Sequence, residues 1–364
     1  MIVTGLKLRG FRNYASCEAE FHPGINLIVG ANAQGKTNLI ESLVCLSLTR
    51  SHRVKNDQKL IMEGADHADI ACVCVNGKRK RLRMVIHKDG KSLMYDRQPV
   101  KRMSDFIGLL NVVLFSPDDL SLFNDAPRER RRVMDQEIGK INSGYLHAVS
   151  RYQNFLKEKN NLLKTPVPDE TYLDILDERM IEEEIIILNE RKQFVASLNE
   201  TVPEIYRELS QEEDRISIGY ETYVSFEEDL KEELVRIHRT NRVRDLEYRL
   251  STNGVHRDDM KFLMNEQSIP DIASQGQKRM TILAFKMALA EYIRTHTGES
   301  PVLLLDDVLS ELDRHHQERL ISKVRTAEQC FITAAEMPET IKGLEPSVYE
   351  VINGTVRQTG GSNE

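Results

Sequence analysis

The chain has 364 residues, of which 40% are hydrophobic and 29% charged, and it contains no tryptophan. This length exceeds that of a usual single domain, so we expect two lobes, or one domain that carries a large insertion. The formal net charge of −7 argues against a generally basic nucleic-acid binder, although local positive patches are compatible with it.

The sequence also predicts the compartment. Residues 1–4 lack the basic and then apolar layout of a signal peptide, and no apolar run approaches the length of a membrane span. The five cysteines are scattered in a pattern that fits neither a disulfide framework nor a zinc site. We therefore expect a cytoplasmic protein that does not associate with a membrane.

The first segment predicts two strands joined by a turn. Val3, Leu6 and Leu8 indicate a strand, and a second strand is expected near residues 17–21. Arg12 lies in the turn between them and precedes a candidate phosphate loop. It is either a nucleotide contact or a solvated arginine of the turn.

A phosphate-binding loop follows. The apolar run 25–29 predicts a buried strand and residues 39–46 predict a helix, and the segment between them fits the pattern G-x-x-x-x-G-K-[ST] in full. Its residues are Gly30, Ala31, Asn32, Ala33, Gln34, Gly35, Lys36 and Thr37. Such a loop directs backbone N–H groups at an anion, and the helix N-terminus adds positive potential. We expect it to bind the phosphates of a nucleotide, with Lys36 at the β- and γ-phosphates and the Thr37 hydroxyl on Mg²⁺.

A basic β-hairpin is predicted next. Residues 68–75 and 78–87 indicate two strands, and Asn76-Gly77 is a strong hairpin signal between them. Alternation places Arg79, Arg81 and Arg83 on one face, where their spacing suits the phosphates of a nucleic-acid backbone. The alternative is a solvated edge strand whose charges only discourage aggregation.

Composition changes in the middle of the chain. Residues 126–210 are rich in Glu, Lys, Arg, Leu and Ile, and they predict long amphipathic helices joined by a proline turn at 164–169. A strand is expected over 214–223 and a helix over 226–249. The arginines of 128–132 and 236–249 form a second basic concentration.

The last third returns to nucleotide chemistry. Ser274, Gly276 and Gln277 open a predicted helix, where Ser274 is a suitable N-cap and Gly276 permits a ligand to approach the helix N-terminus. The apolar run 302–305 predicts a buried strand that ends in Asp306 and Asp307. Open α/β sheets bind ligands at this strand end, so the two carboxylates are well placed for a metal and for water.

Four stretches stand in the order of the Walker A, signature, Walker B and D-loop motifs of ABC-type ATPases: 30–37, 274–277, 303–307 and 310–313. The long helical insertion between Lys36 and Ser274 resembles the Rad50/SMC branch and not a transporter subunit. Within that branch, nearly the whole chain resembles the RecF family. The segments that carry this narrower resemblance are 11–14, 115–119, 127–131, 256–259 and 307–320.

The resemblance implies an α/β fold, namely an ABC-ATPase (P-loop) head with a mixed sheet and an attached antiparallel β subdomain, plus an inserted helical lobe. We expect the head to comprise 1–115 and 250–364 and the lobe to comprise 116–249. The resemblance also implies catalytic roles for Asp307 and Lys36, with Asp307 activating water and Asp306 binding the metal. It implies nucleotide contacts from Arg12, Ser274, Gly276, Gln277 and Asp313.

The resemblance further implies an ATP-dependent homodimer, in which Ser274 and Gly276 of one protomer close on the phosphate held by Lys36 of the other. Such a dimer binds double-stranded DNA near gaps and single-strand/double-strand junctions. Its implied partners in recombinational repair and replication-fork maintenance are RecR with RecO and, indirectly, RecA. Slow, DNA-stimulated ATP hydrolysis then drives release.

Two features depart from many ABC ATPases. Thr333-Ala334-Ala335 supplies no switch histidine after the strand near residue 330, and no glutamine marks a Q-loop, whose place falls at 116–118. The alternatives are another Rad50/SMC-like ATPase, a transporter-coupled ATPase, or a P-loop kinase or GTPase. A kinase would leave the signature-like Ser274–Gln277 without a role, and the base-specific Asn-Lys-x-Asp motif of GTPases is missing from the sequence.

Overall fold

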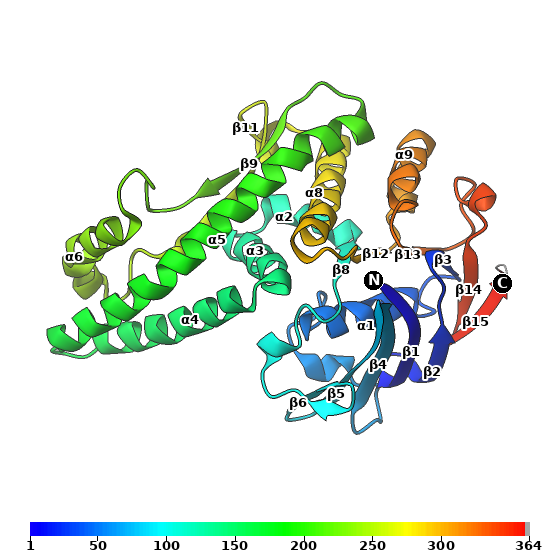
Figure 1. The fold of residues 1–364 in the computed structure, drawn as a ribbon, viewed down its shortest axis with the longest axis horizontal. Coiled ribbons are helices and arrows are strands. Elements are labelled where there is room, and N and C mark those ends of the chain that lie inside the picture. The colour runs from blue at the N-terminus through cyan, green and yellow to red at the C-terminus, as the bar shows by residue number, and fades with distance from the viewer. Residues whose placement is uncertain (361–364) are drawn as a thin grey trace. The chain divides into compact units, whose positions relative to one another are not determined.

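The computed structural model describes residues 1–360, which cluster into two compact units (Figure 1). The first unit comprises Met1–Leu120, Glu204–Glu213 and the chain from Gln275 onward. The second comprises Ser121–Pro203 and Asp214–Ser274. Both the N-terminal and the C-terminal segments therefore belong to one unit, and the other is an insertion.

One sheet of the first unit is antiparallel, in the order β2-β1-β4-β5-β6-β7. Its strands are β1 (Ile2–Phe11), β2 (Tyr14–Glu20), β4 (Ala68–Asn76), β5 (Lys78–His87), β6 (Gly90–Tyr95) and β7 (Gln98–Pro99). The tight turn at Asn76-Gly77 joins β4 to β5, and Val75 pairs with Arg79 in the resulting hairpin. The hairpin expected from the sequence is thus confirmed.

The second sheet is mixed, in the order β15-β14-β3-β13-β12-β8. Its strands are β3 (Gly24–Val29), β8 (Val112–Phe115), β12 (Val302–Leu305), β13 (Gln329–Ala334), β14 (Ser347–Ile352) and β15 (Thr355–Gly360). All neighbours are parallel except β14 and β15. Because β13 lies between β3 and β12, the ends of the two motif-bearing strands face one another across a single strand.

Helix α1 (Lys36–Leu48) lies between the two sheets, where it contacts β4 and β5 of one and β8 and β13 of the other. It is buried on nearly all sides, and Leu39, Ile40, Leu43 and Val44 are each at most 1% exposed. The strand that precedes α1 and the buried helix itself agree with the sequence prediction. The phosphate loop is therefore anchored at both ends in the hydrophobic core.

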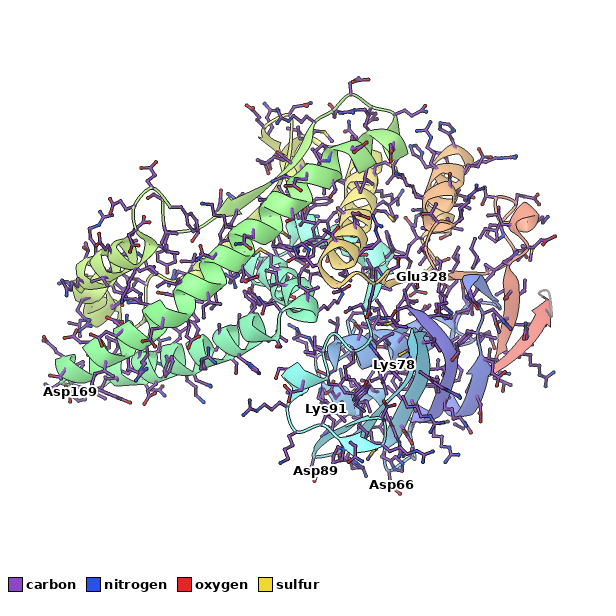
Figure 2. The ribbon with its side chains drawn as sticks, in the orientation of Figure 1. Asp66, Lys78, Asp89, Lys91, Asp169 and Glu328 are labelled. Atoms are coloured by element: carbon purple, nitrogen blue, oxygen red, sulfur yellow. The ribbon has the colours of Figure 1, made fainter. Side chains whose placement is uncertain are left out.

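Polar contacts also join the two sheets. The Val3 N–H donates to Gln329 Oε1 at 2.7 Å, and Gln329 Nε2 donates to the Val3 carbonyl at 2.8 Å. The ammonium group of Met1 pairs with Glu328, which is labelled in Figure 2. These contacts fix the start of β1 against the start of β13.

The first unit contains further helices and short turns outside the two sheets. They are the helices α8 (Gln275–Thr297) and α9 (Arg314–Val324) and the short 3₁₀ turns η1 (Asp57–Leu60), η2 (Met103–Asp105), η3 (Pro117–Leu120), η5 (Leu309–Glu311) and η6 (Lys342–Leu344). Helix α8 packs against β8 and η3, where Lys286 pairs with Asp119 at 2.7 Å.

The second unit is mainly helical. It contains α2 (Ser121–Asn124), α3 (Pro127–Ile141), α4 (Ser143–Leu163), most of α5 (Glu170–Ser210), α6 (Leu230–Tyr248), η4 (Val255–Arg257) and α7 (Ile269–Ile272). The part of α5 that belongs to this unit ends at Pro203. A three-stranded sheet in the order β11-β10-β9 completes it, with β9 (Ile216–Glu221), β10 (Asp259–Met264) and β11 (Gln267–Ser268). The turn between α4 and α5 falls at 164–169, as the prolines predict, and Asp169 of this turn accepts a hydrogen bond from the Tyr172 N–H.

Buried charges of the second unit are paired with one another. Lys159 of α4 contacts Asp177 of α5 at 2.8 Å and Asp245 of α6 at 2.9 Å. His238 of α6 lies between Asp177 and Glu184, at 3.0 and 2.8 Å. Ion pairs thus connect three helices.

The unit boundaries differ from the expected division at 115/116 and 249/250. Residues 250–274 form η4, β10, β11 and α7, and β10 pairs with β9, so this segment belongs to the inserted unit. The last two turns of α5 after Pro203 belong instead to the first unit. There α9 holds them, because Arg319 donates to the Leu209 carbonyl at 3.1 Å and Lys323 pairs with Glu208.

Candidate nucleotide-binding site

The loop between β3 and α1 has a conformation that its glycines permit. Gly30 has φ +152°, and a Cβ there would lie 2.5 Å from the Val351 carbonyl oxygen. Gly35 has φ +120°, and a Cβ there would meet the Asn13 amide at 2.7 Å. Larger residues at either position would displace neighbouring groups. The two glycines are therefore required by the close approach of β14 and of the β1–β2 turn.

Side chains and backbone from distant segments hold this loop. Asn13 Nδ2 donates to the Gln34 carbonyl at 2.9 Å, and the Tyr14 hydroxyl donates to the Gly35 carbonyl at 2.9 Å. From the β14–β15 turn, the Asn353 N–H donates to Gln34 Oε1 at 2.7 Å and the Gly354 N–H to the Gln34 carbonyl at 3.1 Å. Gln34 is thus held by a turn near the N-terminus and by another near the C-terminus.

Lys36 folds its side chain back over the loop. Its ammonium group donates to the carbonyls of Gly30 at 2.6 Å and Ala31 at 3.0 Å. The residue is 8% exposed, and burial lowers the pKa of Lys36, while Asp307 and Asp306 act in the opposite direction. The ammonium group therefore lies at the mouth of an anion-binding loop, within the field of two carboxylates.

Thr37 and Asp306 meet across the sheet, although 269 residues separate them in the chain. The Thr37 hydroxyl donates to Asp306 Oδ1 at 3.1 Å. Burial raises the pKa of the Asp306 carboxyl, while hydrogen bonds from Thr333 and Thr37 act to lower it. A buried carboxylate that relies on neutral donors alone is costly, so a cation at this position would be favoured.

These two residues fit Mg²⁺. A hydroxyl and a carboxylate are hard oxygen ligands, and a magnesium ion bound with a nucleotide takes few protein ligands because phosphates and water complete its shell. Among residues 1–360, no group of three or more His, Cys, Asp and Glu side chains could hold a metal by itself. Thr37 and Asp306 would hold the ion, and it would polarise the phosphates they face.

Asp307 lies beside Asp306 in a different environment. Its backbone is left-handed, with φ +55°, which is uncommon for a residue other than glycine. Its N–H donates to the Thr333 hydroxyl at 2.8 Å, and its carbonyl accepts a hydrogen bond from the Ser310 hydroxyl at 2.7 Å. Asp307 is exposed whereas Asp306 is 6% exposed. The two adjacent carboxylates are therefore suited to different tasks.

Arg12 is held by a partner within the protein. Its guanidinium binds both oxygens of Glu41 at 2.8 and 2.7 Å and donates to the Lys59 carbonyl at 3.0 Å. Glu41 is fully buried in α1, and burial raises its pKa, but hydrogen bonds from Arg12 and Ser51 and the charges of Arg12 and Arg53 outweigh this effect and lower it. Arg12 thus orients α1 from the turn that also carries Asn13.

The signature-like residues begin helix α8. The helix starts at Gln275, so Ser274 is at the N-cap position predicted from the sequence, and both Ser274 and Gly276 are exposed. Gln277 is partly buried, and its carbonyl accepts a hydrogen bond from the Thr281 hydroxyl at 2.8 Å. Asp313 caps α9 by accepting hydrogen bonds from the His316 N–H at 3.0 Å and His316 Nδ1 at 2.6 Å.

Two structural contributors were not identified in the sequence. Thr333 binds both Asp306 and Asp307, and Asn13 joins the loop to Asn38 of α1, whose Nδ2 donates to Asn13 Oδ1 at 2.9 Å. A signal for Thr333 existed, because it is a polar residue near the end of a fully buried strand. Its role depends on the order of strands in the sheet, which the sequence does not reveal.

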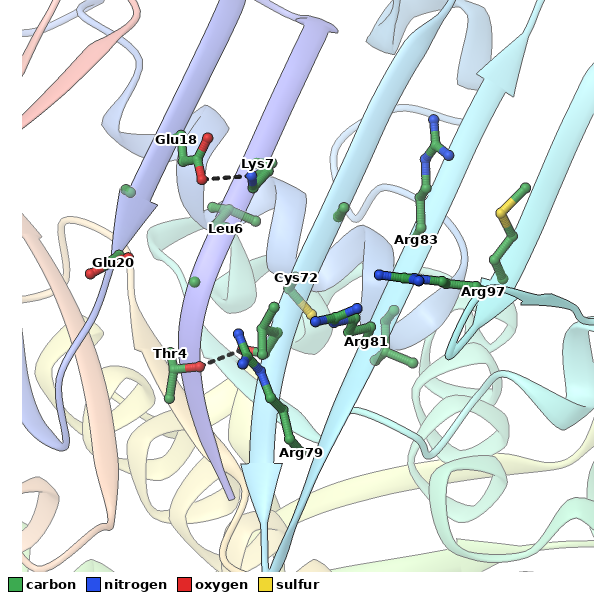
Figure 3. A pocket seen from close by; sticks show the side chains of 16 residues that line it. Thr4, Leu6, Lys7, Glu18, Glu20, Cys72, Arg79, Arg81, Arg83 and Arg97 are labelled. Atoms are coloured by element: carbon green, nitrogen blue, oxygen red, sulfur yellow. Dashed lines mark hydrogen bonds and ion pairs between the residues drawn. The ribbon is translucent and has the colours of Figure 1, made fainter.

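The arginines of β5 line a groove on the outer face of the antiparallel sheet (Figure 3). Arg79, Arg81 and Arg83 are exposed on one face, as alternation predicts, and the groove measures about 500 Å³. Arg83 binds both oxygens of Asp69 at 2.9 and 2.7 Å, whereas Arg97, which the sequence analysis did not single out, adds a guanidinium to the same groove. Glu18 and Glu20 line it as well, so its charge is not uniformly positive.

Part of the second basic concentration is neutralised within its unit. Arg130 binds both oxygens of Asp259 at 2.7 Å, and Arg242 contacts Asp174 and Asp177 at 2.8 and 2.6 Å. These two arginines therefore hold the helical unit together, whereas Arg239, Arg244 and Arg249 of the same concentration are exposed. In the part of the chain that the structure describes, no helix combines the length and apolarity needed to cross a bilayer.

Comparison with known proteins identifies the class and then the family. A family model for the RecF/RecN/SMC N-terminal domain matches residues 2–122. The fold is also similar to the head domain of Smc from Pyrococcus furiosus, with a TM-score of 0.58 and 18% identity over 99% of this chain and 96% of that one. The fold is therefore that of an ABC-type ATPase head of the SMC kind.

Two relatives identify the family within this class. The DNA replication and repair protein RecF of Geobacillus thermodenitrificans is 37% identical over 98% of this chain and 99% of its own length. RecF of Lactobacillus gasseri is 36% identical, with the same coverage. A solved structure of the recombination mediator protein RecF with ATP, in the RecFOR pathway, has a TM-score of 0.91 at 28% identity and covers 98% of this chain and 97% of its own. The chain belongs to the RecF family.

Proposed function

We propose that this protein binds ATP with Mg²⁺ at the β3–α1 loop and hydrolyses it slowly. The observation that carries this proposal is the 3.1 Å contact between Thr37 and Asp306, which brings the loop and the end of β12 together beside Lys36. A RecF structure with ATP is similar over nearly the whole chain, which supports the choice of nucleotide. Transporter-coupled ATPases, P-loop kinases and GTPases are less consistent with this family and its helical insertion.

The roles of the site residues follow from their surroundings. Lys36 neutralises the β- and γ-phosphates, and the loop N–H groups bind the same oxygens. Asp307, which is exposed and adjacent to the metal ligand, accepts the proton of the attacking water. Because the chain has Ala334 and Ala335 after Thr333, no histidine assists at that point, and hydrolysis is slow.

ATP binding then drives formation of a homodimer. In this arrangement Ser274 and Gly276 at the exposed N-terminus of α8 close on the γ-phosphate held by Lys36 of the partner protomer. Gln277 and Asp313 complete the shared site. Arg12 contributes by fixing the turn that supports the loop, because its guanidinium is bound to Glu41.

The dimer binds double-stranded DNA near gaps and single-strand/double-strand junctions, through Arg79, Arg81 and Arg83. It works in the cytoplasm with RecR and RecO and helps to load RecA during recombinational repair and at replication forks, and DNA stimulates the hydrolysis that drives release. The family membership and the RecFOR pathway of the similar structure support this assignment.

Sizing by light scattering tests the proposal. We expect a monomer alone, a dimer with ATP and Mg²⁺, and a larger complex when duplex DNA is added. Ser274→Arg should bind ATP with nearly unchanged affinity but remain monomeric, because a bulky cation at the N-terminus of α8 blocks the phosphate of the facing protomer. Normal ATP-dependent dimers of this variant would rule out the shared site.

A further inference from the structure

Thr333 occupies a central place at the carboxyl edge of the mixed sheet. It lies on β13, which pairs with β3 through Thr333 and Ile28 and with β12 through Ile332 and Leu305. The residue is 1% exposed. Its side chain therefore lies between the strand that leads into the phosphate loop and the strand that leads into Asp306.

The Thr333 hydroxyl is used in both directions. It donates to Asp306 Oδ1 at 2.8 Å and accepts the Asp307 N–H at 2.8 Å. A hydroxyl can do both because it has one hydrogen and two lone pairs. The same Asp306 oxygen also accepts the Thr37 hydroxyl, so two threonines from different segments converge on it.

The backbone at Asp307 requires such support. A left-handed aspartate is a strained conformation that persists only where the surrounding structure holds it. The hydrogen bond from its N–H to Thr333 and the hydrogen bond from Ser310 to its carbonyl fix the peptide groups on both sides of the residue. The left-handed backbone thus sets the direction in which the Asp307 side chain leaves the end of β12.

We propose that Thr333 is a positioning residue for hydrolysis, which holds Asp306 toward the metal and turns Asp307 toward the attacking water. This inference rests on the proposed function. Thr333 is followed by Ala334 and Ala335, so no histidine follows this strand to contact the phosphate. The Thr333 hydroxyl lies behind the two carboxylates and acts through them. Its contribution acts through the carboxylates, and it should affect the rate more than the affinity for ATP.

The test compares Thr333→Val with Thr333→Ser. Valine keeps the shape but removes both hydrogen bonds, whereas serine retains them. Three quantities are measured: the affinity for a fluorescent ATP analogue at saturating Mg²⁺, the Mg²⁺ concentration that gives half of the maximal binding, and the single-turnover rate of hydrolysis. Thr297→Val is the matched control, because the Thr297 hydroxyl donates to the Ile293 carbonyl at 2.7 Å, at the C-terminal end of α8.

We expect Thr333→Val to lower the hydrolysis rate about tenfold or more and to raise the Mg²⁺ requirement several-fold, while affinity at saturating Mg²⁺ changes about threefold or less. Thr333→Ser should recover most of the rate, and Thr297→Val should match the wild type. If Thr333→Val does not fold, as judged by thermal melting, Thr333→Ala carries the same comparison.

Two results would overturn the inference: a wild-type rate and Mg²⁺ requirement in the hydroxyl-free variants, or equal impairment of Thr333→Ser and Thr333→Val. Failure of the proposed function has a different signature, because the wild-type protein itself would then neither bind the analogue nor hydrolyse ATP. That result would remove the basis of this inference as well.

Discussion

Buried charge is paired in the helical unit and unpaired around the phosphate loop of the ATPase unit. In the helical unit, Lys159 and His238 are paired with carboxylates from neighbouring helices, and the pKa of Asp177 is lowered well below its usual range by His238 and Lys159 despite its burial. In the ATPase unit, Lys36 and Asp306 make no ion pair within residues 1–360, and burial shifts the pKa of each toward its neutral form. A buried charge of the first kind is compensated by its partner, so that removing either partner destabilises the fold. A buried charge of the second kind is suited to bind a ligand.

Removal of Lys159 should have the largest effect on stability. Lys159→Met leaves Asp177 and Asp245 buried without their shared cation, and we expect a loss of about 3–5 kcal/mol in the free energy of unfolding. Urea denaturation followed by circular dichroism measures it. Lys36→Met is the matched control, because the Lys36 ammonium makes no ion pair in the described chain. The urea midpoint of this variant should stay near that of the wild type. Equal losses in both variants would erase the contrast between the units.

The stability of the helical unit should also depend on pH. Burial alone would lower the pKa of His238, but Glu184 and Asp177 raise it to about 9. A raised folded-state pKa means that the protonated form stabilises the protein fully below about pH 6.5, and that this stability is lost as pH rises toward 9. We expect a loss on the order of 3 kcal/mol across that window.

Unfolding free energies of the wild type and of His238→Gln, measured from pH 6 to 10, test this expectation. The slope should flatten in the variant, because glutamine does not titrate. His315→Gln on the exposed side of α9 serves as the control and should keep the wild-type slope. A slope that survives in His238→Gln would assign the pH dependence to another group.

Lys36→Ala should weaken ATP binding without a comparable loss of stability in the ATPase unit. Loss of the cation that faces the β- and γ-phosphates should weaken ATP binding by about 100-fold, or roughly 2.7 kcal/mol, and ATP-dependent DNA binding should be lost with it. Isothermal titration with ATP and Mg²⁺ measures the affinity. Unchanged affinity would show that the β3–α1 loop is not the nucleotide site.

The smallest expected effect concerns the hairpin arginines. Arg79→Ala with Arg81→Ala should lower the slope of log affinity for duplex DNA against log salt by roughly 0.9 for each phosphate that the protein no longer neutralises, with no effect on ATP binding. Arg83→Ala is the comparison variant. Because Asp69 already holds Arg83, its substitution should change the slope less. An unchanged slope in the double variant would move the DNA surface elsewhere.

Local sequence patterns predicted those features that depend on neighbours in the chain. The strand, loop and helix around Lys36, the Asn76-Gly77 hairpin and the apolar run before Asp306 all follow from short-range periodicity, and the structure confirms them. The resemblance to the RecF family predicted the mixed sheet and the helical insertion. What could not be predicted depends on contacts between distant segments.

Three features illustrate this limit. The pairing of β9 with β10 moved residues 250–274 into the helical unit, because strand partners are not encoded by either strand alone. The bond of Arg12 to Glu41 depends on how the first turn meets α1. Thr333 acquires its position only because β13 lies between β3 and β12.

The hydrogen bonds from the β14–β15 turn to Gln34 have a consequence for synthesis on the ribosome. Residues 30–37 emerge early, but the backbone groups of Asn353 and Gly354 that hold the loop emerge more than 300 residues later, after Thr333. A nascent chain therefore exposes residues 30–37 long before the hydrogen bonds from Asn353 and Gly354 can form. A product interrupted before these residues would carry the motif without this support.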